Sequence, residues 1–363
     1  MSECKIRFGT AGTSDSFTAM GYKNSLDIPA YTEKMGLDAF EYQCGHGVRL
    51  GLDKARQMAD DAAARGILFS VHAPYYISAS SLDEEKRLNS VNYLLQSAAL
   101  CRALGGRRVI FHSGSCGRQS REAALEKALD TLKRAQDALD EAGFAEIILC
   151  PETMGKIGQL GTLEEVLALC GVDRRITPCI DFGHLNARTL GGIRSKADYA
   201  AILDRIGEAL GDARARQFHV HFSRIEYSKG GEKRHWTFAE TQFGPEPQPL
   251  MELLAERGLA PVIICESAGT QAEDAKTMKR FFEACLCTTS QSGLRPPRPG
   301  CGTQHPQRFA CVLLAAAPTT TPCFRHWRRS SLLPLPRGAS GEEMKLCGMP
   351  RPPLGRGGGI AQR

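Results

Sequence analysis

Six short apolar runs of the sequence each lead into a histidine or a carboxylate, and these are the side chains best suited to chemistry. They are His72, His112, Glu152, Asp181, His221 and Glu266. Imidazole nitrogens and carboxylate oxygens are donors for Zn2+, and also for Mn2+ or Fe2+. Such groups buried together without a cation would be costly, and carboxylates can bridge two cations about 3.5–4 Å apart. The pattern therefore predicts a metal-dependent site.

Three further histidines accompany this set. His184 lies three residues beyond Asp181, in an expected loop, and His235 ends the basic segment 229–235, which a solvated turn would explain equally well. His219 shares a strand face with His221 but lies one layer deeper, so we expect it to pack behind the ligands. Taken singly, a strand histidine is usually a core residue and a strand-end aspartate usually caps a helix. The repetition along the chain therefore carries the prediction.

The segments that must position these residues alternate in type over residues 1–288. Eight short apolar or β-branched runs predict strands at 5–9, 39–43, 68–72, 108–112, 147–152, 178–181, 217–223 and 261–266. Amphipathic stretches predict helices at 28–35, 53–64, 82–104, 119–142, 163–170, 196–210, 249–257 and 272–284. Gly66 and Gly105 follow two expected helix ends, and Thr162 with Glu165 reads as a capping box.

Eight strand–helix units of this length predict a single (β/α)8 TIM barrel of the α/β class. The carboxyl ends of barrel strands share one rim, where active sites lie, so the six residues should converge there. The alternative is a doubly wound open sheet. It is less favoured because no Gly-rich dinucleotide loop follows the first expected strand.

Charge and proline content divide the chain into two expected parts. Residues 289–363 hold 11 of the 46 Lys and Arg, two of the 40 Asp and Glu, and 11 of the 19 Pro. This composition predicts a mostly disordered tail, which is either a basic arm for nucleic acid or, as we favour, a dispensable extension. Residues 1–288 keep 35 basic and 38 acidic residues, so bulk charge gives no evidence of nucleic-acid binding by the barrel.

The sequence also predicts a compartment. No apolar run approaches the ~20 residues of a membrane span, and the first residues lack the pattern of a secretory signal. We therefore expect a cytoplasmic protein without a membrane partner, in which most of the 14 cysteines are thiols.

Seven motifs, in their order and spacing, resemble the endonuclease IV family of zinc-dependent apurinic/apyrimidinic DNA repair nucleases. They are His72-Ala-Pro-Tyr75, Phe111-His112-Ser-Gly-Ser115, Pro151-Glu152-Thr-Met-Gly155, Cys179-Ile-Asp181-Phe-Gly-His184, Val220-His221-Phe222, Arg234-His235 and Ile264-Cys265-Glu266. The resemblance covers roughly residues 5–284. It implies hydrolysis of the DNA phosphodiester 5′ to an abasic site, in base excision repair, by a chain that needs no obligate protein partner and acts as a monomer on double-stranded DNA.

The resemblance also implies a set of zinc ligands. His72, His112 and Glu152 would hold a first ion, and Glu152 would bridge to a second held by Asp181, His221 and Glu266. A third would use His184, His235 and an aspartate two residues before His235. It further implies that Glu152 holds the ion pair together and that Glu266 orients or deprotonates the attacking water.

The sequence departs from the family at several of these motifs. Lys233 occupies the position of the expected aspartate, and a protonated lysine has no lone pair for a metal. Glu232 is a possible substitute in a different register. Two or three metals are therefore expected, and Lys233 or Arg234 could instead neutralise a phosphate oxygen. The family's Asp-Thr-Cys-His run is here Asp181-Phe-Gly-His184, and its His-Leu-Asn-Asp run is His221-Phe-Ser-Arg224.

Loop residues on the same rim are the expected DNA contacts. Tyr75 matches a family position that inserts at the lesion, Tyr76 is its neighbour, and Arg49 lies near a family arginine that probes the gap. Ordinary loop packing would explain both tyrosines equally well.

A metal-dependent sugar isomerase or epimerase on the same barrel is the competing interpretation. Such an enzyme would use Glu152, Asp181, His221 and Glu266 as a single-metal site, with a carboxylate moving a proton next to a carbonyl. Four histidines would then have no role: His72, His112, His184 and His235. A non-catalytic metal-binding or scaffold protein is a third possibility.

Overall fold

Eight parallel strands form one sheet in a computed structural model that describes residues 5–211 and 213–291. The strands are β1 (Arg7–Ala11), β2 (Ala39–Gln43), β3 (Leu68–His72), β4 (Arg108–Phe111), β5 (Ile148–Pro151), β6 (Cys179–Asp181), β7 (His219–Phe222) and β10 (Val262–Cys265). Their order is β5-β4-β3-β2-β1-β10-β7-β6. A parallel bridge from Glu152 to Cys179 links the two outer strands, so the sheet curls into a nearly closed barrel. The predicted TIM barrel is confirmed.

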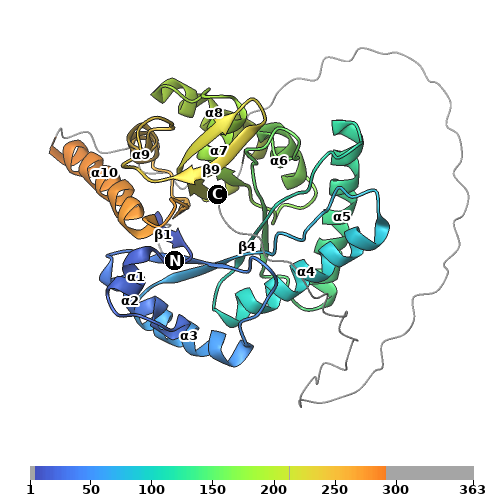
Figure 1. The fold of residues 1–363 in the computed structure, drawn as a ribbon, viewed down its shortest axis with the longest axis horizontal. Helices are drawn as coiled ribbons and strands as arrows, with labels where there is room; N and C mark the ends of the chain where they lie inside the picture. The colour runs from blue at the N-terminus through green and yellow to red at the C-terminus, as the bar shows by residue number, and fades with distance from the viewer. Residues whose placement is uncertain (1–4, 212, 292–363) are drawn as a thin grey trace, which may run out of the picture. The chain divides into compact units, whose positions relative to one another are not determined.

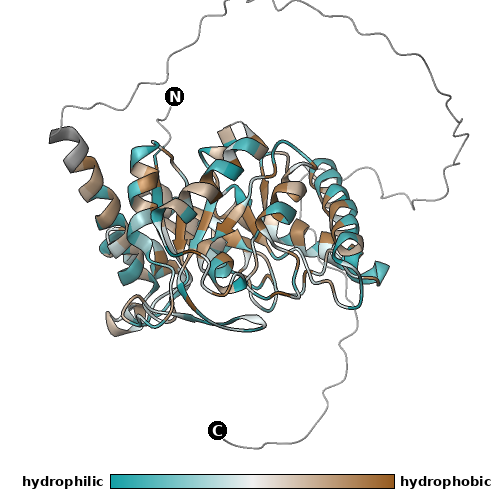
Figure 2. Ribbon diagram, turned by 90° about the horizontal axis from the view of Figure 1, so that it is seen from above, coloured by the Kyte–Doolittle hydropathy of each residue, from teal (hydrophilic) through white to brown (hydrophobic). Residues whose placement is uncertain are grey.

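Helices surround these strands (Figure 1). They are α1 (Asp15–Ala19), α2 (Ile28–Lys34), α3 (Leu52–Ala64), α4 (Glu84–Ala103), α5 (Arg121–Glu141), α6 (Leu163–Cys170), α7 (Phe182–Arg188), α8 (Lys196–Leu210), α9 (Pro247–Glu256) and α10 (Gln271–Gln291), with single 3-10 turns at Ser25–Asp27 and Ala213–Ala215. Figure 2 shows that their hydrophobic faces turn toward the strands and their polar faces turn outward. This is the amphipathic pattern that buries one face of each helix against a sheet.

The expected helix signals act as predicted where the structure tests them. The hydroxyl of Thr162 accepts the N–H of Glu165, whose carboxylate accepts the N–H of Thr162 in return, and together they start α6. Gly66 and Gly105 follow the ends of α3 and α4 with φ of 69° and 71°, the left-handed backbone that glycine adopts without strain.

Three local predictions were wrong. The first strand begins at Arg7 rather than at residue 5, because its register is set by pairing with β2 and β10. His184 lies in α7, not in a loop, because Asp181 caps a helix immediately after β6. The segment 229–235 is not a loop: β8 (Arg224–Ser228) and β9 (Gly231–Trp236) form an antiparallel hairpin between β7 and α9.

The predicted tail, 289–363, overlaps the described residues only at its start. Helix α10 runs to Gln291, and most of the predicted tail, 292–363, lies outside the described residues. Within 5–211 and 213–291, no helix is long and apolar enough to cross a bilayer, and none of the nine cysteines there forms a disulfide.

Candidate metal centre

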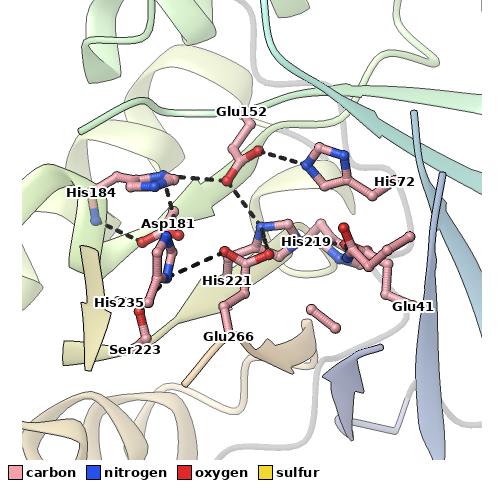
Figure 3. Close-up of polar contacts among 12 residues, drawn as sticks. Glu41, His72, Glu152, Asp181, His184, His219, His221, Ser223, His235 and Glu266 are labelled. Carbon is pink, nitrogen blue, oxygen red and sulfur yellow. Dashed lines mark hydrogen bonds and ion pairs between the residues drawn. The ribbon is translucent and has the colours of Figure 1, made fainter. Parts of the chain in front are cut away.

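The six strand-end residues meet at the carboxyl rim of the barrel, as the parallel strands require. His184 from α7 and His235 from β9 join them there (Figure 3). A cavity of about 450 Å3 opens above the group. Its lining consists of Gln43, His72, Tyr75, His112, Met154, Lys156, Gln159, His184, Glu232, His235 and Glu266. Glu152, Asp181 and His221 are fully buried beneath it.

Glu152 is the centre of the cluster. Its Oε2 lies 3.2 Å from Nε2 of both His72 and His112, and its Oε1 lies 3.0 Å from His221 Nδ1 and 3.3 Å from His184 Nδ1. Burial opposes ionisation, yet the charge of His221 and hydrogen bonds from the surrounding imidazoles hold the pKa of Glu152 well below its ordinary value. Glu152 is therefore a buried carboxylate that faces four imidazoles, as a bridging ligand would.

Asp181 does two things at once. Its Oδ1 accepts the backbone N–H of His184 at 2.7 Å and caps α7. Its Oδ2 is buried and lies 3.2 Å from His184 Nδ1, but it accepts no hydrogen bond. Burial raises the pKa of Asp181 to about 6. Glu266 Oε1 lies 3.4 Å from His221 Nδ1 in the same group. A buried carboxylate oxygen that accepts no hydrogen bond, beside a carboxylate and imidazoles, is a position that a cation would satisfy.

His184, Glu232 and His235 form a neighbouring group. Glu232 carboxylate oxygens lie 3.4 Å from His184 Nε2 and 3.8 Å from His235 Nε2. Residues three apart on a regular strand would face opposite sides. Here Tyr227 pairs with Glu232 while Glu226 pairs with Arg234, so one extra residue of β9, at position 233, forms a β-bulge. The bulge turns Glu232 to the same side as His235.

Lys233 and Arg234 take the other face of the hairpin. Both bind the carboxylate of Glu226, the Arg234 guanidinium also lies 5.0 Å from the Trp236 ring, and neither side chain lines the cavity. The structure thus brings Glu232, rather than Lys233, to the position beside His184 and His235.

Of the other expected DNA contacts, Tyr75 lines the cavity, whereas Tyr76 and Arg49 do not. Tyr75 lines the cavity and is 57% exposed, with its ring 5.8 Å from that of His112. Tyr76 is equally exposed but turns to His46 and Tyr93. Arg49 is exposed on the loop after β2, outside the cavity lining.

Most of the inward-facing imidazoles are held from behind. Nδ1 of His72 contacts the Ala73 carbonyl at 2.9 Å, and Nδ1 of His184 contacts the Thr153 carbonyl at 3.0 Å. Because a carbonyl oxygen only accepts, each Nδ1 carries the proton and each Nε2 presents a lone pair to the cluster. The Ser223 hydroxyl holds His235 Nδ1 at 2.8 Å. These contacts fix the ring orientations that metal ligands need.

A divalent cation fits the residues present. Within each of the groups His72/Glu152/His221, Glu152/Asp181/His221/Glu266 and His184/Glu232/His235, one ligand atom from each residue lies within 4.8 Å of the others. The mixture of imidazole and carboxylate donors suits Zn2+, Mn2+ or Fe2+. His112 joins the first group through its 3.2 Å contact with Glu152.

Packing explains why Gly183 stands where the endonuclease IV motif has a cysteine. A Cβ at this position would lie 2.5 Å from the Ser223 carbonyl oxygen and 3.0 Å from the Ile225 side chain, because β8 packs directly on α7. The cysteine of the endonuclease IV motif does not fit here without moving the hairpin that carries Glu232 and His235.

Gly183→Cys is therefore expected to destabilise the fold by about 1–3 kcal/mol, the usual cost of overpacking. Thermal unfolding followed by circular dichroism would measure it. Gly207→Cys is the matched control, since nothing lies within 4 Å of a Cβ at this site in α8. Equal melting temperatures for the two variants would contradict the packing explanation.

Several functional candidates were missed from the sequence. Gln43, Met154, Lys156 and Gln159 line the cavity but were not among the predicted site residues. Glu41, in the middle of β2, is fully buried against His219 and His221. An acidic residue inside an apolar strand was the available signal for Glu41.

The barrel and its rim define a class of protein: a TIM barrel whose strand ends present carboxylates and imidazoles in groups able to hold divalent cations. The sequence pattern of the xylose isomerase-like TIM barrel family matches residues 29–285. The chain belongs to this family.

Two relatives by sequence differ in how much of their length matches this chain. "Uncharacterized protein MJ0133" of Methanocaldococcus jannaschii is 32% identical over 281 residues, which are 77% of this chain and 98% of that protein. "Probable endonuclease 4" of Mycoplasma pneumoniae is 31% identical over 121 residues, which are 32% of this chain and 41% of that protein. The chain thus matches less than half the length of that endonuclease relative.

Two solved structures share the fold. An L-ribulose 3-epimerase has a TM-score of 0.55 at 18% identity, covering 79% of this chain and 97% of its own. Endonuclease IV from Thermus thermophilus has a TM-score of 0.54 at 20% identity, covering 78% and 99%. Since the fold serves both an epimerase and an endonuclease, the reaction must be argued from the site.

Proposed function

We propose that this protein is a zinc-dependent endonuclease that hydrolyses the DNA phosphodiester 5′ to abasic sites, with three cations in its site. One observation carries the proposal. Beyond the four ligands that a single-metal isomerase needs, His72, His112, His184 and His235 turn into the same pocket. A one-metal sugar site has no use for four further imidazoles, whereas a three-cation site uses all of them. The partial sequence match to a probable endonuclease 4 supports the same choice.

Different residues of the site would have different roles in phosphodiester hydrolysis. Divalent cations in such a site supply Lewis-acid activation of water and of the phosphate. Glu152 would hold two of the ligand groups together, because its two oxygens face different imidazoles. Glu266 lies at the cavity wall with its side chain 14% exposed, where its carboxylate can orient water and accept a proton.

Lys156 would bind the phosphate. It is the one lysine or arginine in the described lining of the cavity, whereas Lys233 and Arg234 are engaged with Glu226. An ammonium at the mouth of a carboxylate-rich pocket would attract the anionic backbone and offset part of the pocket's negative charge.

Lys156→Ala is expected to raise KM for an abasic duplex and to make the plot of log Kobs against log salt less steep by about 0.9, the effect of one lost phosphate contact. Binding measured over a salt series tests this. Lys86→Ala, an exposed lysine on α4, is the control. The same salt dependence in both variants would remove Lys156 from the DNA contact.

Tyr75 would stack on a base at the lesion. Tyr75→Ala is expected to weaken binding of abasic DNA by about 1–3 kcal/mol, the usual contribution of one stacked base. Tyr76→Ala is the matched control, because Tyr76 is equally exposed but turns away from the cavity. Fluorescence anisotropy with abasic and intact duplexes would separate the two variants. A larger loss for Tyr76→Ala would contradict the assignment.

The proposal includes the setting of the reaction. We propose that residues 1–288 form the catalytic unit, that residues 289–363 are not needed for cleavage, and that the protein works as a cytoplasmic monomer. Arg49 would add a contact to the backbone near the lesion from its exposed loop.

The test is nicking of a duplex that carries one abasic site, using the full chain loaded with zinc or manganese. The expected result is a single cut 5′ to the lesion, lost on addition of a strong chelator and absent from the intact duplex. A metal-loaded protein that leaves the abasic duplex intact and interconverts ketose epimers would favour the single-metal sugar enzyme instead.

A further inference from the structure

Behind the cation groups lies a second polar layer inside the barrel, formed by Glu41, Ser70 and His219 from β2, β3 and β7. All three side chains are buried, Glu41 and His219 completely (Figure 3 shows both). Burying a carboxylate there costs free energy unless hydrogen-bond donors surround it. We therefore asked which groups contact the Glu41 carboxylate.

Three donors and one further imidazole surround the Glu41 carboxylate. Oε2 accepts from the Ser70 hydroxyl at 2.9 Å and from His219 Nε2 at 3.0 Å. Oε1 accepts from Gln43 Nε2 at 3.2 Å and lies 3.0 Å from His221 Nε2. The contact with His221 is an ion-pair contact without the alignment of a hydrogen bond. Each oxygen thus meets two nitrogen or hydroxyl groups.

Of these four groups, His221 is the one that belongs to the proposed cation ligands. Its Nδ1 lies 3.0 Å from Glu152 and 3.4 Å from Glu266. Without a cation, Nδ1 shares a hydrogen bond with Glu152. Once a cation takes the Nδ1 lone pair, a neutral imidazole must carry its proton on Nε2, and the Glu41 carboxylate is the acceptor beside that atom. Backbone carbonyls hold Nδ1 of His72 and His184, and a hydroxyl holds Nδ1 of His235. Behind His221 lies Glu41, a carboxylate that belongs to none of the three proposed cation groups.

We infer that Glu41 is a positioning residue, which fixes the Nε2–H tautomer and the ring orientation of His221 and strengthens Nδ1 as a cation ligand. Hydrogen bonds from Ser70, Gln43 and His219 hold the Glu41 carboxylate in place. The inference rests on the proposed cation site but not on the nuclease activity. A carboxylate behind a ligating histidine increases the basicity of the imidazole, and loss of such a partner typically lowers metal affinity about 10- to 100-fold.

The first experiment measures zinc affinity by competition with a chromophoric chelator. Glu41→Gln keeps the shape of the side chain but removes the charge, and it should weaken the binding of zinc about 10- to 100-fold. Glu41→Asp should recover part of the loss. Glu126→Gln removes the charge of an exposed glutamate on α5 that does not line the cavity, and it should leave affinity close to that of the wild type. Melting temperatures of the metal-free variants separate this effect from a general loss of stability.

The second experiment needs no variant. In the zinc-loaded wild-type protein, 15N chemical shifts of the His221 ring should report a protonated Nε2. A protonated Nδ1, or an unchanged zinc affinity in a folded Glu41→Gln variant, would overturn the inference. If the protein fails to cut abasic DNA while Glu41→Gln still loses zinc, the positioning role stands and only the proposed substrate fails.

Discussion

Glu152→Gln should reduce cleavage of an abasic duplex by at least about 10³-fold, the scale on which loss of a central catalytic group acts. The substitution keeps the shape of the side chain but removes the negative charge that faces four imidazoles. Without that charge, the imidazoles lose the carboxylate that holds two ligand groups together. Zinc content should fall in the same variant, because both groups share Glu152.

Initial rates under single-turnover conditions, with zinc in excess, would measure the effect. Glu126→Gln is the control, since this glutamate is exposed on α5 and does not line the cavity. If Glu152→Gln retained a rate comparable to that of Glu126→Gln, Glu152 would not be the centre of the site.

The second large effect is expected at two adjacent residues of β9. Glu232→Ala should lower the cleavage rate about 10²- to 10³-fold, the effect of removing one group that stabilises charge in the transition state. Lys233→Ala should leave the rate nearly unchanged. The difference follows from the β-bulge at position 233, which turns Glu232 toward His184 and His235 and leaves Lys233 on Glu226.

This pair tests the placement of the third cation group directly. Both variants sit in the same strand, so a general disturbance of the hairpin would affect both. A large loss in Lys233→Ala with an active Glu232→Ala would show that the lysine acts on the substrate and that the carboxylate is dispensable. Lys233→Asp, which restores the family residue, should not exceed the wild-type rate, because position 233 faces outward.

The barrel and most of the rim residues could be predicted from the sequence because each depends on a local pattern. A histidine or carboxylate directly after an apolar run is placed at the rim by the run itself. His72 and Asp181 are examples, and both lie at the ends of the strands that were expected.

The remaining residues depend on tertiary pairing. Glu232 reaches the cluster only because β9 bulges against β8, and a bulge is not visible in the spacing from His235. Lys156 reaches the cavity through a loop whose neighbour Gly155 packs against Glu232, where a Cβ would approach its side chain to 2.6 Å. Glu41 looks like an isolated acid in a core strand until His219 and His221, some 180 residues later, are seen beside it.

The β8–β9 hairpin could have been predicted from the sequence. Ile225 and Tyr227 alternate with polar residues before a Lys-Gly-Gly turn, which is a pattern typical of a β-hairpin. The cluster of basic residues in the same segment is also typical of a solvated turn, which hides the strand pattern. Strand alternation was the more informative signal.

Counting the bound cations distinguishes a barrel that holds three cations from one that holds a single cation. The full chain is dialysed to equilibrium against buffered zinc, and bound zinc is measured by mass spectrometry alongside Glu232→Ala. We expect three zinc ions per chain in the wild type and one fewer in Glu232→Ala. A single zinc per chain, unchanged by Glu232→Ala, would rule out the three-cation site and identify the four-ligand group of a sugar isomerase or epimerase as the whole site.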